Sequence, residues 1–179
     1  MAKVAIVYFS GTGTTRAVAQ AVQEGVESAG AECVVHEIVG TDITEGRWSN
    51  DAIFASLDDS DAIIFGTPTY MGSVAGQMKT FMDAVASRWY TKAWDNKLGA
   101  AFTASALAGG DKQNSLFTLV TFAMQMCMRW VGTGANPAEG LNMNGFYLGV
   151  GVGASSAEDI DPAERKTAVH LGARVVAAI

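Results

Sequence analysis

Six consecutive hydroxyl-bearing and glycine residues follow the first apolar segment of the chain, and their types suit the binding of an anion. The segment is Ser10-Gly11-Thr12-Gly13-Thr14-Thr15. It offers four hydroxyl groups, two glycines at which backbone can approach a ligand closely, and free amides at the start of a predicted helix. Neutral donors can hold a phosphate dianion, because each hydrogen bond to a charged oxygen is charge-assisted. A threonine-rich helix cap would explain one or two of these residues but not six, so the sequence predicts a phosphate site.

Other phosphate-binding motifs do not fit this segment. A nucleotide P-loop ends in Gly-Lys-Ser/Thr, and the lysine is absent. A dinucleotide-binding fingerprint would start at Gly11 and would place Arg16 where its third glycine allows close helix–strand packing. A receiver domain requires an acidic cluster after the first strand, and this segment contains no acid.

Two further segments of unusual composition follow predicted strands. The first of them is Gly66-Thr67-Pro68-Thr69-Tyr70-Met71-Gly72-Ser73, a predicted turn that Pro68 stiffens. Its Tyr70 and Met71 side chains offer surface to a planar heteroaromatic ring, and an ordinary turn with an exposed tyrosine is the alternative. Thr103-Ala104-Ser105-Ala106-Leu107-Ala108-Gly109-Gly110 combines small residues, hydroxyls and a glycine pair, with a flexible surface loop as the alternative. Because ligands bind outside the carboxyl ends of strands in open α/β sheets, all three segments are expected at one ligand site.

The elements that must position these segments alternate along the chain. Periodicity predicts strands at Lys3–Phe9, Ala31–Val39, Asp61–Gly66, Leu98–Ser105 and Phe146–Val150. Helices are predicted at Thr14–Ala29, at Asp51–Leu57, along the stripes Val74–Val85 and Leu116–Cys127, and after a cap at Asp161, with Pro162 first and Glu164 third. Residues 40–50 read as a polar loop and 132–145 as irregular. Without a linker or repeat, residues 1–179 are predicted to be a single α/β domain, a five-stranded parallel sheet covered on both faces.

Composition narrows the functional classes. Hydrophobic residues make up 49% of the chain and charged residues 17%, which excludes a disordered chain. No apolar run approaches the ~20 residues of a membrane span, and the N-terminus reads as a strand rather than a secretion signal, so a cytoplasmic protein without a membrane partner is expected. The net charge of −6 and the lack of a basic cluster argue against a nucleic-acid partner. Cys33 and Cys127 are expected to be reduced core thiols rather than a disulfide or metal site, and His36 and His170 to be structural or solvent-facing.

Two of these segments carry a resemblance to known families. Ser10–Thr15 resembles the phosphate loop of flavodoxin-like FMN proteins, whose pattern is S/T-x-T-G-x-T. Ile63–Gly72, continuing through Gly76–Asp83, closely resembles WrbA-type NAD(P)H:quinone oxidoreductases. The similarity covers most of residues 3–131 and returns at the final helix. It implies a flavodoxin-like doubly wound sheet of strand order 2-1-3-4-5, non-covalently bound FMN, NAD(P)H as electron donor and a quinone or similar acceptor. Because the family forms tetramers, it also implies a homo-oligomer, a dimer or tetramer.

The resemblance assigns site residues but no catalytic side chain. By that likeness Trp89 would wall the quinone and nicotinamide pocket, usually across a subunit boundary. The family histidine of the fourth helix is replaced here in the region of Met124 and Gln125, and an aromatic residue of the first loop is replaced by Thr12. A reduced quinone would thus lack its usual proton donor. The FMN phosphate would be held by Ser10, Thr12, Gly13, Thr14 and Thr15, and the isoalloxazine lined by Pro68, Thr69, Tyr70, Met71, Gly72, Thr103, Ala104, Ser105, Gly109 and Gly110.

The expected reaction has two steps. NAD(P)H delivers a hydride to FMN and leaves, and an acceptor then takes two electrons, which predicts ping-pong kinetics. The main alternative is a flavodoxin-type electron carrier without its own substrate. Flavodoxins usually follow their fourth strand with an acidic, aromatic loop, and residues 103–110 contain neither kind of side chain. A third possibility is an interaction protein that has lost FMN.

Overall fold

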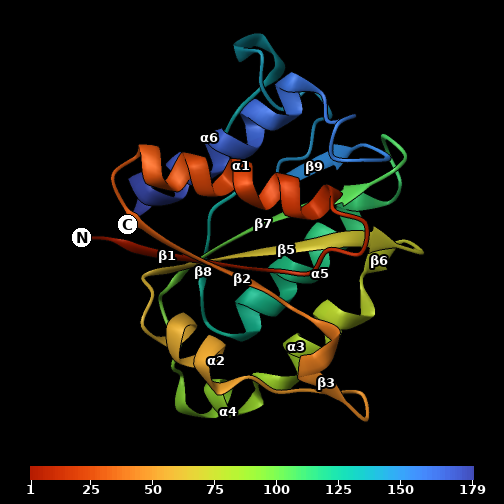
Figure 1. The fold of residues 1–179 in the computed structure, drawn as a ribbon. Helices are drawn as coiled ribbons and strands as arrows, with labels where there is room; N and C mark the ends of the chain where they lie inside the picture. Colours follow the sequence, from red (N-terminus) through yellow and green to blue (C-terminus); the bar gives the residue numbers. More distant parts are fainter.

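One parallel sheet lies between two layers of helices in the computed structural model, which describes residues 1–179 (Figure 1). The strands of the sheet are β1 Lys3–Tyr8, β2 Glu32–Glu37, β5 Ala62–Tyr70, β7 Leu98–Ser105, β8 Arg129–Trp130 and β9 Val150–Gly153. They are ordered β2-β1-β5-β7, and both β8 and β9 pair with β7 at the far edge. The predicted order 2-1-3-4-5 is therefore confirmed, with β5, β7 and β9 in the third, fourth and fifth places.

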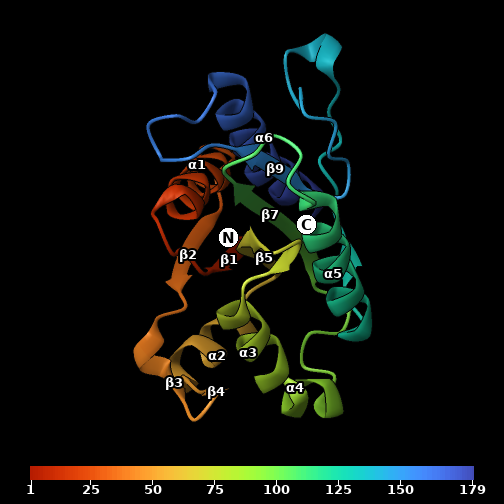
Figure 2. The ribbon, with the colours of Figure 1, turned by 90° about the vertical axis from the view of Figure 1, so that its right-hand side faces the viewer.

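The helices are divided between the two faces of the sheet (Figure 2). One face is covered by α1 (Thr14–Ser28) and α6 (Pro162–Ala178), and the other by α2 (Asp51–Asp58), α3 (Gly76–Ala84), α4 (Ala86–Thr91) and α5 (Lys112–Gln125). Each layer buries its own apolar cluster, of 22 and 20 residues respectively. The central strands contribute alternate side chains to the two clusters, which is why they read as continuous apolar runs.

Local signals account for the end of α1 and for the start of α6. Gly30 follows α1 with a φ of 85°, in the left-handed region that ends helices. At the start of α6, the Asp161 carboxylate accepts a hydrogen bond of 2.7 Å from the amide of Ala163, and Pro162 occupies the first helical position. These signals fix where the chain leaves and re-enters the sheet.

Two glycines allow α1 and α6 to pack with their backbones in contact. A Cβ placed on Gly25 would lie 1.9 Å from the carbonyl oxygen of Val169, and one on Gly172 would lie 2.1 Å from that of Val22. No side chain larger than hydrogen fits either position without separating the helices. This contact holds the helix that follows the predicted phosphate segment against the end of the chain.

The fifth strand differs from its prediction. Residues 146–149 are irregular, and the strand runs from Val150 to Gly153. Phe146 and Leu148 are apolar because they pack against the core from a loop, not because they lie in the sheet. The loop returns to the edge through hydrogen bonds from Trp130 Nε1 to the Leu148 carbonyl (2.8 Å) and from Thr133 to the Gly149 carbonyl (2.6 Å). The edge of the sheet beside β7 is thus shared by two short strands.

The third strand is longer than predicted. β5 continues through Thr67, Pro68 and Thr69 to Tyr70, because Pro68 still pairs with Ala104 of β7. The predicted turn is reduced to the two residues Met71 and Gly72, which join β5 to the short strand β6 (Ser73–Val74).

The polar loop at residues 40–50 contains regular structure. A short 3-10 helix at Gly40–Asp42 precedes the hairpin of β3 (Ile43–Thr44) and β4 (Arg47–Trp48). Trp48 anchors this hairpin, since its ring is buried edge-on against Phe54 and Phe81.

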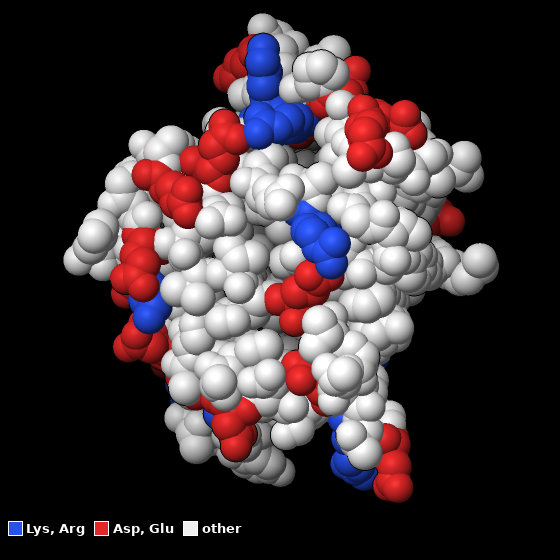
Figure 3. All heavy atoms as spheres, viewed as in Figure 1, with Lys and Arg blue, Asp and Glu red and all other residues white.

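The surface is acidic overall and carries no basic patch on the face drawn in Figure 3, where basic side chains lie beside acidic ones. None of the helices combines the length and apolarity required to cross a bilayer. Neither cysteine is in a disulfide, but Cys127 is exposed, so the prediction of two core thiols was wrong for that residue. Cys127 lies just past α5 with a φ of 60°, where the chain reverses towards β8.

Candidate cofactor site

The segments after β1, β5 and β7 meet at the carboxyl edge of the sheet, as predicted from their positions. The Tyr70 hydroxyl lies so close to Gly11 that a Cβ on this glycine would be 2.3 Å from the oxygen. On the other side, Asn114 of α5 donates a hydrogen bond of 2.8 Å to the carbonyl of Gly72. Residues 70–72 therefore lie against the first segment on one side and are tied on the other side to α5, the helix that follows the third segment.

The first segment is folded around the hydroxyl of Ser10. This oxygen accepts hydrogen bonds from the amides of Gly13 (3.1 Å) and Arg16 (3.3 Å). Gly13 precedes α1 with a φ of 98°, which glycine adopts without strain. The loop is thus shaped by its own side chain into a turn at the positive end of a helix.

Several donors of this loop have no partner within the protein. The amides of Gly11, Thr12, Thr14 and Thr15 donate to no protein acceptor. The Thr14 hydroxyl is buried and also lacks a hydrogen-bond partner. Buried polar groups are normally paired, so an orphaned hydroxyl beside free amides fits a loop whose partner is a bound anion. The residues present therefore fit the phosphate of the implied FMN.

No free cation completes the first segment. The guanidinium of Arg16 makes an ion pair of 2.8 Å with Glu37 in β2, and the same carboxylate accepts a hydrogen bond of 3.2 Å from Tyr8. Arg16 is thereby tied to the neighbouring strand. Any anion held here depends on amides, hydroxyls and the helix dipole.

A buried cluster of hydroxyls joins the second segment to the third segment and to α5. The Thr69 oxygen is 2.8 Å from that of Thr103 and 2.7 Å from that of Ser115 in α5. These hydroxyls are engaged with one another, and Ala104 beside them is also buried. The cluster ties β5, β7 and α5 together.

In the second segment, Tyr70 and Met71 are exposed. The exposed fraction of Tyr70 is 44%, and Met71, with a φ of 47°, is fully exposed beside Gly72, whose φ is 80°. Two consecutive left-handed residues form the tight reversal that suits a two-residue hairpin. The turn thus projects an aromatic and a thioether side chain at the rim of the site.

The third segment is held by Lys112, a residue that the sequence interpretation missed. Its ammonium donates hydrogen bonds to the Ser105 hydroxyl (2.8 Å) and to the Leu107 carbonyl, and its amide donates to the Gly109 carbonyl (3.3 Å). The Lys112 side chain is fully buried, and this burial lowers the pKa of its amine. A lysine at the first position of a helix is disfavoured by the helix dipole, and this unusual position was the one feature of the sequence that could have pointed to Lys112.

Glu164 is the second buried charge that the sequence did not reveal. Predicted at the third position of α6, it turns inward, where its carboxylate accepts hydrogen bonds from the Gly153 amide (3.1 Å) and from Asn144. Burial raises the pKa of this carboxyl group. Glu164 thereby connects α6 to the end of β9, the strand adjacent to the third segment.

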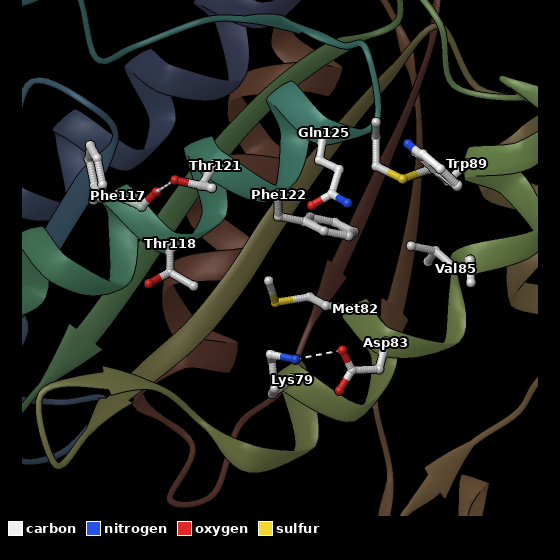
Figure 4. A pocket seen from close by; sticks show the side chains of 12 residues that line it. Lys79, Met82, Asp83, Val85, Trp89, Phe117, Thr118, Thr121, Phe122 and Gln125 are labelled. Carbon is white, nitrogen blue, oxygen red and sulfur yellow. Dashed lines mark hydrogen bonds and ion pairs between the residues drawn. The ribbon is translucent and has the colours of Figure 1, made fainter.

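Trp89 lies apart from the three segments, in a groove of about 430 Å³ between α3, α4 and α5 (Figure 4). Its exposed fraction is 44%, and it lies near one end of the groove, as does Gln125 of α5. Phe122 and Met82 line the middle, and none of the residues lining the groove belongs to the three segments. The structure therefore does not bring Trp89 together with the other predicted site residues of the same chain. Met124, also in the region of the missing histidine, is 47% exposed.

Both histidines lie away from the three segments. His36 in β2 is 2.8 Å from the Ser56 hydroxyl, and burial, followed by the charge of Lys3, lowers its pKa. His170 in α6 is 3.1 Å from the carbonyl of Thr133. Neither side chain is placed to exchange a proton with a ligand at the carboxyl edge.

Comparison with known proteins agrees with this architecture. The chain is 39% identical over 166 residues to "Flavodoxin FldP" of Pseudomonas aeruginosa, covering 90% of this chain and 85% of that protein. It is 33% identical over 184 residues to an "NAD(P)H dehydrogenase (quinone)" of Azorhizobium caulinodans, covering 97% and 92%. Among solved structures, a flavodoxin, WrbA-like protein from Agrobacterium tumefaciens superposes with a TM-score of 0.80 at 36% identity, covering 99% of this chain and 97% of that one.

A family model gives the assignment. The model described as NADPH-dependent FMN reductase matches residues 3–134, which include all three loop segments and Trp89. The predicted relationship to flavodoxin-like FMN oxidoreductases is confirmed by this match and by the relatives. The chain belongs to the NADPH-dependent FMN reductase family.

Proposed function

We propose that the protein binds FMN non-covalently and transfers electrons from NAD(P)H to a quinone or similar small acceptor. The observation that carries this proposal is the first segment, where free amides and the orphaned Thr14 hydroxyl all lie at the start of α1. Family membership and the curated relatives named NAD(P)H dehydrogenase (quinone) support the same activity.

The residues of the three segments would divide the work of holding FMN. The first segment would hold the phosphate through Ser10 and Thr12–Thr15. Residues 68–72 and residues 103–105 with Gly109 and Gly110 would line the isoalloxazine. Bound FMN supplies the chemistry of accepting a hydride and passing on two electrons, and the protein supplies position and electrostatics. The Thr69–Thr103–Ser115 hydroxyl cluster makes the floor of the ring site rigid.

We further propose that a second copy of the chain completes the substrate pocket. The groove of Trp89 is lined by Met82, Phe117 and Phe122, and Trp89 and Phe117 are exposed, at 44% and 60%. Exposed aromatic side chains beside an apolar groove are typical of an interface. A dimer or tetramer would place Trp89 of one subunit over the three segments of its neighbour. We also propose that the protein is cytoplasmic.

The electron-carrier alternative is kept because of one specific relative, the flavodoxin of Pseudomonas aeruginosa at 39% identity. A carrier needs FMN at an exposed site but no pocket for nicotinamide. The two functions therefore predict different behaviour toward NADH and NADPH.

A single set of assays tests both functions. The protein is purified, loaded with FMN, and mixed with NADH or NADPH in the presence and absence of benzoquinone. Turnover that requires the acceptor is expected for the reductase. If FMN binds but neither NADH nor NADPH is oxidised, the electron-carrier function is supported instead. A correctly folded protein that does not bind FMN would exclude both.

A variant pair tests the proposed assembly. Replacing Phe117 with glutamate puts a charge in the groove, and replacing Gln113, exposed on α5 outside it, with glutamate is the matched control. The groove variant is expected to sediment as a monomer with FMN bound but with quinone reduction lost. An oligomer that is unchanged in the groove variant would contradict the assembly.

A further inference from the structure

Lys112 is completely buried, and both hydrogen bonds of its ammonium go to one segment, while the Phe146 ring lies on another side with its centroid 5.9 Å from the ammonium nitrogen. Its side chain is 0% exposed at the first position of α5. Both acceptors of its ammonium, the Ser105 hydroxyl and the Leu107 carbonyl, are neutral and belong to the segment after β7. Lys112 takes part in none of the ion pairs of the structure. Its positive charge is therefore held in place without a direct counter-ion.

Three features of this placement lower the stability of the folded protein, so stability does not explain why a lysine stands here. A buried ammonium loses its hydration. The first turn of a helix is its positive end, which repels a cation. The backbone entering the helix is also strained, because Gly110 and Asp111 both have a φ of 55° and Asp111 is not a glycine. Glu164 is the acid that acts on Lys112, and its carboxylate is already bonded to the Gly153 amide and Asn144.

Lys97 provides an internal comparison at the opposite end of β7. Its ammonium also binds backbone carbonyls, those of Asp58 (2.9 Å) and Ser60. It is only partly buried, and three acids, Asp58, Asp59 and Asp61, act on it. Lys97 is therefore a structural clamp of ordinary kind, whereas Lys112 places a charge that takes part in no ion pair under the segment expected to line the flavin.

We propose that Lys112 is a positioning residue for FMN, whose ammonium fixes the 105–110 segment against the ring and whose charge favours reduced over oxidised FMN. This inference rests on the proposed function. Two-electron reduction adds negative charge to the flavin ring, and a fixed cation nearby stabilises that charge more than it stabilises the neutral ring. Charge close to the ring is one of the means by which a protein sets the electronic properties of a flavin.

The test compares Lys112→Met, Lys112→Arg and Lys97→Met, each loaded with FMN. The midpoint potential is measured by equilibration with a reference dye, and the affinity for oxidised FMN by fluorescence titration. In Lys112→Met the preference for reduced FMN is expected to fall about tenfold, which is about 30 mV more negative for a two-electron couple. Lys112→Arg should recover most of the shift because it keeps the charge. Lys97→Met should leave the potential unchanged.

Two results would overturn the inference. One is a Lys112→Met potential equal to that of the wild type, and the other is an equal shift in Lys97→Met. If Lys112→Met does not fold, Lys112→Gln replaces it, since an amide can still donate to the Leu107 carbonyl but carries no charge. A wild-type protein that binds no FMN would remove the proposed function together with this inference. A Lys112→Met protein that binds FMN with the midpoint potential of the wild type would remove the inference alone.

Discussion

Replacing Thr14 with valine should make the FMN-free protein more stable, although it removes a residue of the proposed phosphate site. The Thr14 hydroxyl is buried and has no hydrogen-bond partner in the protein. An unsatisfied buried polar group costs about 1–3 kcal/mol. Valine has the branched shape of threonine without the hydroxyl, so the surrounding packing is kept. We expect Thr14→Val to raise the free energy of unfolding by about 1–2 kcal/mol.

The same substitution should weaken FMN binding. A hydrogen bond to a charged group contributes about 1.5–3 kcal/mol, and each 1.4 kcal/mol is a factor of about ten in affinity. The dissociation constant of FMN should therefore rise about 10- to 100-fold. Urea unfolding of the FMN-free protein gives the first quantity, and quenching of FMN fluorescence on titration gives the second.

Thr80→Val is the matched control in α3. The Thr80 hydroxyl already donates a hydrogen bond of 2.8 Å to the carbonyl of Gln77. Its loss should destabilise the protein by about 0.5–1 kcal/mol and leave FMN affinity unchanged. The opposite signs of the two stability changes distinguish an orphaned hydroxyl from a paired one. Thr14→Val with lower stability than the wild type, or with unchanged FMN affinity, would refute the assignment of this hydroxyl to the cofactor.

Two further predictions concern the packing of the fold outside the site. Gly172→Ala should lower the free energy of unfolding in urea by about 2 kcal/mol or more, because the new methyl group meets the backbone carbonyl of Val22, which cannot rotate away. Gly76→Ala is the control, because its methyl group enters open space in α3. It should be neutral or should raise the free energy of unfolding by up to about 1 kcal/mol in the same experiment. The pKa of His36 is lowered by burial, with Lys3 adding to the effect, so the unfolded chain takes up a proton that the folded protein binds more weakly. The wild type should therefore lose stability relative to His36→Gln as the pH falls from about 7 to about 5, and a parallel decline of the two proteins would contradict this assignment.

The buried parallel strands and the first helix could be predicted because their signals are local. β1 is a continuous apolar run, because both faces of the sheet are covered. Gly30 readily adopts the left-handed conformation that ends α1. The cap at Asp161 is a hydrogen bond within three residues of sequence. The composition of the three segments likewise located the candidate site, because strand order brings the carboxyl ends of β1, β5 and β7 together.

The features that were missed depend on contacts between distant residues. The residues from Phe146 to Val150 have the composition of a strand, but Phe146 is apolar because it packs against the core from a loop. Pro68 usually signals a turn, yet pairing with Ala104 keeps it within β5. Lys112 has a side chain that is normally exposed, and its burial arises from a fold in the 105–110 segment that no local pattern predicts. Sequence periodicity thus gives the central strands of the sheet but neither its far edge nor the interior of the site.

On the proposed function, the difference between a carrier and a reductase would depend on assembly as much as on the single chain. In one chain the rim of the candidate site is open, because Tyr70, Met71 and Leu107 are exposed, while Trp89 lies in a separate groove. An open rim suffices for binding FMN and for passing electrons to a partner. A nicotinamide must be stacked on the flavin, which requires a second wall, and the proposed neighbouring subunit would supply it. Dilution below the dissociation constant of the oligomer should therefore abolish NAD(P)H oxidation per bound FMN without releasing FMN. Oxidation per FMN that does not change with protein concentration, in a protein shown to be monomeric, would place the wall within one chain and exclude this explanation.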